Sequence, residues 1–358
     1  MQWTRRQLLG SGLAAAAAWT MNGKARAGED SPVRAAGSKI GLSLAAYSFR
    51  DYLPQGGKPG KFTLHDLCDL AAGWNLDAIE PTSYYFSSED AAYIHSLKAR
   101  AFRLGLDISG MPIRNNFCLP PGKARDAELQ HVRTWVDHAV ELGVPCIRIF
   151  AGQKNDPEND FAWMVDGMKA SCDYAGSRGV FLGIENHGYL TDTAEALLRI
   201  VDAAGHEWLG VNLDTGNFRD RPYDHMAAVA HLALTVQIKI QVRTADGTGV
   251  EDADFERIAG ILRNANYRGY AALEYEGKED PMSAVPVCLD RLRQRVPTPE
   301  AEVTVTETAI DPAHEVELAD TVEVALQVVL DRLTPNERVA FVLHDSFGFE
   351  FPTIAAVL

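Results

Sequence analysis

The sequence predicts an α/β protein in which eight parallel strands form a closed (β/α)8 TIM barrel. Short apolar and β-branched runs alternate with longer amphipathic segments eight times between residues 39 and 296. A stretch of about 260 residues with this alternation is typical of such a barrel. The sequence has no G-x-G-x-x-G after its first strand and no P-loop. This disfavours the alternative, an open doubly wound sheet.

Each expected element follows from this alternation. The strands are expected at 40–49, 76–82, 106–113, 145–152, 180–186, 209–215, 235–242 and 270–276. The helices are expected near 63–75, 88–104, 124–143, 158–178, 192–204, 222–232, 253–266 and 280–294. Two of these helices begin with capping signals, Thr63 with Asp66 and Asp192 with Glu195.

The composition is that of a folded, acidic protein. Hydrophobic residues make up 46% of the 358 residues and charged residues 23%, which is usual for globular domains. The formal net charge of −15 disfavours nucleic acid and anionic membranes as partners. The five cysteines are scattered and form no C-x-x-C pair. We therefore expect buried thiols rather than disulfides or a structural zinc site.

Residues 1–27 have the layout of an export signal. Arg5 and Arg6 precede a weakly hydrophobic Ala/Gly stretch, and Ala25-Arg26-Ala27 follows as a cleavage site. This resembles a twin-arginine signal peptide, which implies a periplasmic or otherwise exported protein and the twin-arginine (Tat) translocase as a partner during export. The apolar run is too short for a stable membrane anchor. The alternative is a cytoplasmic arm that contains Arg-Arg, and residues 28–38 read as a polar leader.

The chain beyond the predicted barrel has a different composition. Residues 300–358 contain twelve Asp or Glu and only two Lys or Arg, so 297–321 reads as an acidic linker. Residues 322–358 are expected to form a short helical extension, in which LTPNERVAFVLHDSFGFEF resembles the start of region four of an extracytoplasmic-function sigma factor. The chain stops before a recognition helix, so DNA binding is not expected. A gene fusion, a frameshift or an assembly artefact would each explain the resemblance.

Candidate functional residues lie where the predicted strands end, because barrel active sites form at the carboxyl ends of the strands. An acidic side chain in an apolar strand is costly to bury without a cation or a partner. Several carboxylates at equivalent strand ends therefore suggest one shared cation. The candidates are Glu80, Glu185, His187, Asp214, Asn217, Gln237, Lys239, Arg243, Glu274 and Glu276, with Tyr47, Arg148 and Phe150 as weaker lining candidates.

Residues 38–296 resemble the xylose-isomerase-like sugar phosphate isomerase/epimerase family, through GIENHG, NLDTGNF and ALEYEG. The resemblance implies a divalent metal ion held by Glu185, Asp214, a residue of the seventh strand and Glu274. The family has His at that seventh-strand position, whereas this chain has Gln237. Oxygen ligands favour Mn²⁺ or Mg²⁺, with Co²⁺ or Zn²⁺ as other ions. Alternatively, Gln237 contacts only the substrate and no metal is bound.

The resemblance also implies roles for the remaining candidates. Arg243 falls at the spacing of an Arg in the family's epimerases, and Asn217 occupies the place of a substrate-contacting His of the family. Both are assigned to substrate binding, together with His187 and Glu80. The expected function is a metal-dependent sugar isomerase or epimerase acting on a ketose or keto-sugar. Glu185 and Glu274 would move a proton through an enediolate, and Lys239 would add positive charge.

Several alternatives to this function stay open. A keto-glycoside lyase or hydratase would use the same proton abstraction, and a non-catalytic barrel would only bind a sugar. An apurinic endonuclease activity is not expected, because the seventh-strand His is missing and the chain is acidic. The expected partner is a small sugar, and association into a homo-oligomer is left open.

Overall fold

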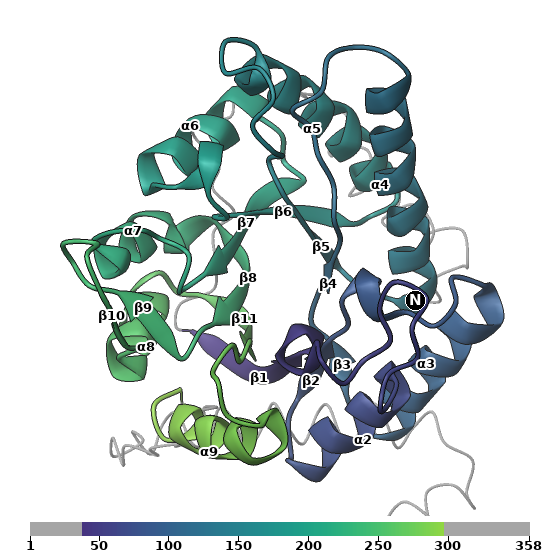
Figure 1. Cartoon of the computed structure of the whole chain (residues 1–358), viewed down its shortest axis with the longest axis vertical. Coiled ribbons are helices and arrows are strands. Elements are labelled where there is room, and N and C mark those ends of the chain that lie inside the picture. Colours follow the sequence, from purple (N-terminus) through teal and green to yellow (C-terminus); the bar gives the residue numbers. More distant parts are fainter. Residues whose placement is uncertain (1–37, 297–358) are drawn as a thin grey trace, which may run out of the picture. The chain divides into compact units, whose positions relative to one another are not determined.

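The computed structural model describes residues 38–296, which form a ring of parallel strands surrounded by helices (Figure 1). The ring strands are β1 (Lys39–Ala45), β2 (Ala78–Glu80), β3 (Asp107–Ile108), β4 (Met111–Pro112), β5 (Cys146–Ile149), β6 (Phe181–Glu185), β7 (Leu209–Asp214), β8 (Ala233–Ile238) and β11 (Arg268–Leu273). The helices are α2 (Leu64–Gly73), α3 (Ala91–Arg103), α4 (Lys123–Leu142), α5 (Asp160–Ser177), α6 (Ala194–Ala204), α7 (Pro222–Val229), α8 (Phe255–Asn264) and α9 (Pro281–Arg293). The predicted (β/α)8 barrel is confirmed.

The chain closes the ring through its third barrel strand. The strands follow the order β3-β2-β1-β11-β8-β7-β6-β5-β4, and every pair is parallel. β3 and β4 stand at the two ends of this order but are successive pieces of one segment, interrupted only at Ser109 and Gly110. That single segment therefore joins both ends of the sheet.

The first and last barrel strands are neighbours. β1 pairs with β11 from Lys39 opposite Arg268 to Leu44 opposite Leu273. Ser48 Oγ, just after β1, donates to the carbonyl of Leu273 at 3.0 Å and accepts from the N–H of Tyr275 at 2.8 Å. The buried hydroxyl of Ser48 thus links the segment that follows β1 to the segment that follows β11, at the seam between these two strands.

Local sequence accounts for the helix boundaries. Thr63 caps α2, because its hydroxyl accepts from the N–H of Asp66 while the Asp66 carboxylate accepts from the N–H of Thr63. The predicted cap of α6 at Asp192 is wrong by one residue. Asp192 has helical dihedrals, whereas Thr193 is extended and its hydroxyl accepts from the N–H of Ala196.

The core lies between the sheet and the helices, as the apolar spacing predicts. In α2 the buried residues recur at i, i+3, i+4 and i+7, namely Leu64, Leu67, Cys68 and Ala71. In β7 all six residues are buried, as is usual for a parallel strand covered on both faces. All five cysteines are buried free thiols.

Two strand boundaries differ from the prediction in a way that matters for the site. β8 ends at Ile238, and the chain then forms a separate hairpin of β9 (Gln241–Arg243) and β10 (Val250–Asp252). At Lys239, just beyond the strand, the backbone N–H donates to the side-chain hydroxyl of Thr215 at 2.9 Å. β11 ends at Leu273, so Glu274 follows the strand directly.

Several predicted segments lie outside the described residues. These are the signal peptide (1–27), almost all of the leader (28–38), the acidic linker (297–321) and the sigma-like extension (322–358). Among residues 38–296, no helix is both long enough and apolar enough to cross a membrane.

Candidate functional site

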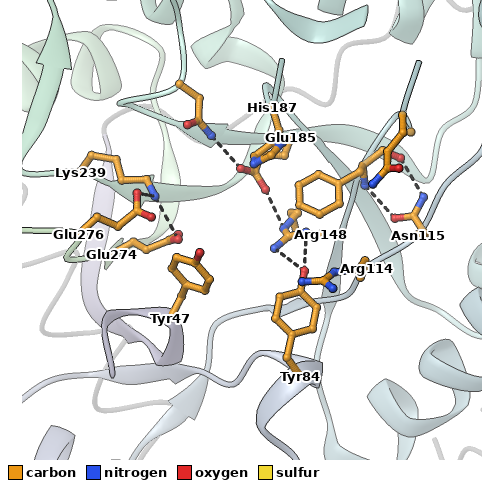
Figure 2. Close-up of a pocket in the computed structure, with 14 residues that line it drawn as sticks. Tyr47, Tyr84, Arg114, Asn115, Arg148, Glu185, His187, Lys239, Glu274 and Glu276 are labelled. Carbon is orange, nitrogen blue, oxygen red and sulfur yellow. Dashed lines mark hydrogen bonds and ion pairs between the residues drawn. The ribbon is translucent and has the colours of Figure 1, made fainter. Parts of the chain in front are cut away.

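A polar cavity of about 400 Å³ opens at the carboxyl ends of the barrel strands. Figure 2 shows side chains from opposite sides of the ring pointing into it. Its lining residues are Tyr47, Tyr84, Arg114, Asn115, Arg148, Phe150, Gly152, Gln153, Glu185, His187, Asn217, Lys239, Glu274 and Glu276. More than half of the site residues expected from the strand ends therefore line a single cavity.

One wall of the cavity is built around the ammonium group of Lys239. Its Nζ lies 2.5 Å from Glu276 Oε2 and 3.0 Å from Glu274 Oε1, and 5.9 Å from the ring centre of Tyr47. Burial disfavours the charge, but the nearby carboxylates of Asp214, Glu274 and Glu276 raise the pKa of Lys239 well above its usual range. The side chain is therefore a fixed positive charge.

The facing wall holds a second buried ion pair. Arg148 Nε lies 2.8 Å from Glu185 Oε2, and both side chains are less than a tenth exposed. Asn217 Nδ2 donates to the other oxygen of Glu185 at 2.9 Å. Burial raises the pKa of Glu185, and Arg148 opposes that rise. A carboxylate with a raised pKa is suited to take up and release a proton near neutral pH.

Asp214 lies beneath the cavity rather than on its surface. It is fully buried, and its Oδ1 accepts from the N–H of Gly216 at 2.8 Å. Its Oδ2 has no hydrogen bond and lies 3.4 Å from Lys239 Nζ. Burial raises the pKa of Asp214. Asn186 fixes this strand end by two hydrogen bonds to the backbone of Asp214, each 2.8 Å.

Gln237 and Glu80 belong to a polar network inside the barrel. Gln237 Nε2 donates to Glu80 Oε2 at 2.8 Å, and Gln237 Oε1 accepts from Asn212 Nδ2 at 2.9 Å. Thr235 donates to Asn212 at 2.6 Å. Burial raises the pKa of Glu80 to about 8. Neither Gln237 nor Glu80 lines the cavity, so the structure does not place them as the predicted metal ligand and substrate contact.

Of the other predicted substrate contacts, Asn217 and His187 line the cavity and Arg243 does not. The ring centre of His187 lies 4.6 Å from that of Phe150, which also lines the cavity. Arg243 is exposed on β9 and does not line the cavity. The β9–β10 hairpin places Arg243 away from the carboxyl end of β8, where its predicted role requires it to lie.

The strand-end prediction misses part of the lining. Arg114 and Asn115 follow β4 closely, and Tyr84 follows β2. The same rule, applied to every strand and to its following loop, would include them. Arg114 packs its guanidinium 4.7 Å from the Tyr84 ring centre, and Arg148 reaches the hydroxyl of the same ring at 3.4 Å.

The residues present do not fit a divalent metal ion. Among the described residues, no group of three or more His, Cys, Asp or Glu side chains is arranged to hold one. The amide oxygen of Gln237 already accepts from Asn212. A divalent ion bound by both Asp214 and Glu274 would share these carboxylates with the ammonium of Lys239, which already contacts both, and the two positive charges would repel each other.

The sequence matches one family model over most of the barrel. The xylose isomerase-like TIM barrel family matches residues 68–295, well over half of the chain. The chain belongs to this family. The match begins within α2 and ends just after α9, so it contains all the cavity residues except Tyr47.

Solved structures of this barrel share its fold at low sequence identity. A D-psicose 3-epimerase determined with D-fructose is 17% identical, with a TM-score of 0.61 over 72% of this chain and 99% of that one. A 3-keto-D-glucoside 4-epimerase from E. coli is 18% identical, with a TM-score of 0.56 over 72% and 99%. A probable 3-DHS dehydratase from Bacillus anthracis is 16% identical, with a TM-score of 0.52 over 71% and 98%. At these identities the likeness shows the fold.

A second similarity is short. A probable extracytoplasmic-function sigma factor, SigI of Mycobacterium tuberculosis, is 47% identical over 51 residues, or 14% of this chain and 18% of that protein. The related factor SigJ is 48% identical over 60 residues, or 17% and 19%. This chain thus spans about a fifth of the length of the curated relatives it matches, which agrees with the sigma-like resemblance in the sequence.

Proposed function

We propose that this xylose isomerase-like barrel is a sugar isomerase or epimerase that acts on a ketose or keto-sugar. The observation that supports this best is a pair of buried carboxylates, Glu185 and Glu274, on one cavity, each beside a fixed cation. Arg148 lies 2.8 Å from Glu185, and Lys239 lies 3.0 Å from Glu274. The epimerases among the structural neighbours are consistent with this reading.

The proposed reaction is a proton transfer at a carbon next to a carbonyl. One carboxylate takes the proton from that carbon, and the electron pair of the C–H bond moves onto the carbonyl oxygen to form an enediolate. Lys239 and Arg148 place positive charge near the oxygen as its negative charge develops. The other carboxyl returns a proton to the opposite face of the same carbon, giving epimerisation, or to the neighbouring carbon, giving isomerisation.

Hydrogen exchange from solvent tests the proposal across a panel of candidate sugars. The protein is incubated in D2O with D-fructose, D-psicose, D-tagatose and 3-keto-glucosides, and NMR detects deuterium next to the carbonyl. Glu185→Gln and Glu274→Gln should each slow exchange by about 10²–10⁴-fold. Glu207→Gln, at an exposed carboxylate outside the cavity, is the control and should not change it.

The same experiment separates the alternatives. Loss of a substrate hydroxyl or glycosidic group after deuterium uptake would identify a lyase or hydratase. Binding of a sugar with no exchange would identify a non-catalytic barrel. Full exchange by both Gln variants would refute the roles given to Glu185 and Glu274.

We also propose that the chain is exported through the twin-arginine route. Arg5 and Arg6 with the following Ala/Gly stretch support this. Replacing both arginines with lysine should retain the protein in the cytoplasm, as cell fractionation would show. Equal export of the variant would contradict the proposal.

A further inference from the structure

The ammonium of Lys239 lies among the carboxylates that the family resemblance assigns to a metal ion. Its Nζ is 3.0 Å from Glu274, 3.4 Å from Asp214 and 2.5 Å from Glu276. Figure 2 shows its side chain directed at Glu274 and Glu276 across the wall of the cavity. A single protein cation therefore contacts both Asp214 and Glu274, the predicted ligands from two different strands.

The surrounding backbone is shaped to admit this side chain. A Cβ at Gly216 would lie 2.6 Å from Lys239 Cγ and 2.8 Å from its Cβ, closer than real side chains approach. Only glycine at 216 leaves room for the lysine stem beside Asp214. The backbone N–H of Lys239 is fixed by the hydroxyl of Thr215. The segment that supplies Asp214 therefore also positions Lys239.

The fourth predicted ligand is used elsewhere. Both polar groups of the Gln237 amide are hydrogen-bonded, the oxygen to Asn212 and the nitrogen to Glu80. Gln237 is 2% exposed, so its amide cannot turn toward the cavity without breaking both bonds. Of the four predicted ligands, Gln237 is therefore hydrogen-bonded within the barrel, and Asp214 and Glu274 already contact the ammonium of Lys239.

We propose that Lys239 is the permanent cation of this site and takes the place of a divalent metal ion, which the protein neither needs nor retains. The structural half of this inference depends only on the contacts of Lys239 and Gln237. Its catalytic half, that the Lys239 charge stabilises the enediolate, rests on the proposed function. An ammonium cannot chelate two substrate oxygens as a metal ion does, so the substrate is held mainly by hydrogen bonds from the cavity walls.

Metal analysis of the wild-type protein tests the structural half directly. The full chain is purified, exposed to Mn²⁺, dialysed and analysed by inductively coupled plasma mass spectrometry. Its thermal midpoint is measured with Mn²⁺ and with EDTA. We expect no retained metal and no change in midpoint, because a ligand that binds only the folded state would raise it. Retention of about one ion per chain with a raised midpoint would overturn the proposal.

A double variant provides the positive counterpart. The double variant Lys239→Met with Gln237→His removes the internal cation and restores an imidazole. It should therefore retain roughly one Mn²⁺ per chain, and Mn²⁺ should raise its thermal unfolding midpoint. Lys123→Met, at an exposed position of α4, is the control and should bind none. A folded double variant without Mn²⁺ would also overturn the proposal. If the double variant does not fold, the wild-type measurement decides alone.

Activity separates this inference from the proposed function. Wild-type exchange that survives EDTA supports both. Exchange that is lost with EDTA and restored by Mn²⁺ would overturn the role of Lys239 and leave the proposed function intact. A metal-free protein that exchanges no candidate sugar would count against the proposed function and against the catalytic half, while the structural half stands.

Discussion

Replacing Arg148 with methionine should destabilise the protein in a pH-dependent way. The substitution removes the Arg148–Glu185 ion pair, in which Nε and Oε2 are 2.8 Å apart and neither side chain contacts much solvent. It also removes the 2.8 Å hydrogen bond from Arg148 to the Ile113 carbonyl. Breaking one partner of a buried pair costs about 3–5 kcal/mol when the other charge remains, and a lost buried hydrogen bond costs about 1 kcal/mol.

The pH dependence follows from Glu185. Burial already raises the pKa of this carboxyl, and loss of Arg148 raises it further. The folded variant then holds a proton that the unfolded chain releases above its ordinary carboxyl pKa. Stability is therefore retained at low pH and lost as pH rises. We expect a loss of about 1–2 kcal/mol near pH 5.5 and about 4–6 kcal/mol near pH 8.

Urea unfolding of the full chain at both pH values measures the loss, and Arg148→Met with Glu185→Gln is the matched double variant. Because the neutral amide needs no counter-charge, the double variant should be more stable than Arg148→Met near pH 8. An equal loss at both pH values, together with strictly additive effects in the double variant, would refute the reasoning.

Two further outcomes are expected. The raised pKa of Glu80, about 8, means that wild-type stability should fall between about pH 4.5 and pH 8, by on the order of 4 kcal/mol. Glu80→Gln should flatten this part of the stability–pH curve in thermal melts, and an unchanged slope would contradict the assignment. Arg243→Ala should leave the KM for any sugar that undergoes exchange within about twofold, because a group outside the site does not contribute to binding; Asn217→Ala, next to Glu185, should alter exchange. A large rise in KM for Arg243→Ala would instead support the predicted contact between Arg243 and the substrate.

The barrel is predictable because strand and helix periods differ and alternate regularly along this chain. The same logic locates Glu185 and Glu274, since each stands where an apolar strand ends. The two-residue period of a strand predicts on which face of the sheet a side chain lies, but it does not predict how deeply inside the barrel that side chain is buried. Gln237 and Lys239 follow one another at the spacing of a single face, yet Gln237 bonds within the barrel and Lys239 lines the cavity.

Partners on other strands account for the remaining differences. Asn212 and Glu80 hold Gln237, and no local pattern around residue 237 indicates this. The sequence makes Arg148 only a weak lining candidate, because its pairing with Glu185 depends on the packing of β5 beside β6. The spacing from Gln237 predicts a substrate contact for Arg243. In the structure, however, the chain leaves the barrel sheet before Arg243, which lies in the β9–β10 hairpin.

The seam between β1 and β11 has a consequence for synthesis on the ribosome. Ser48 and the Leu273 carbonyl that it contacts are separated by 225 positions. At about 5–20 residues per second, roughly 10–45 s pass between the emergence of the two. Throughout that interval the edge of β1 that pairs with β11 has no partner strand, which makes the nascent chain prone to wrong association. The last strand to be made, β11, therefore completes the sheet and covers the edge of β1 that has waited longest for a partner.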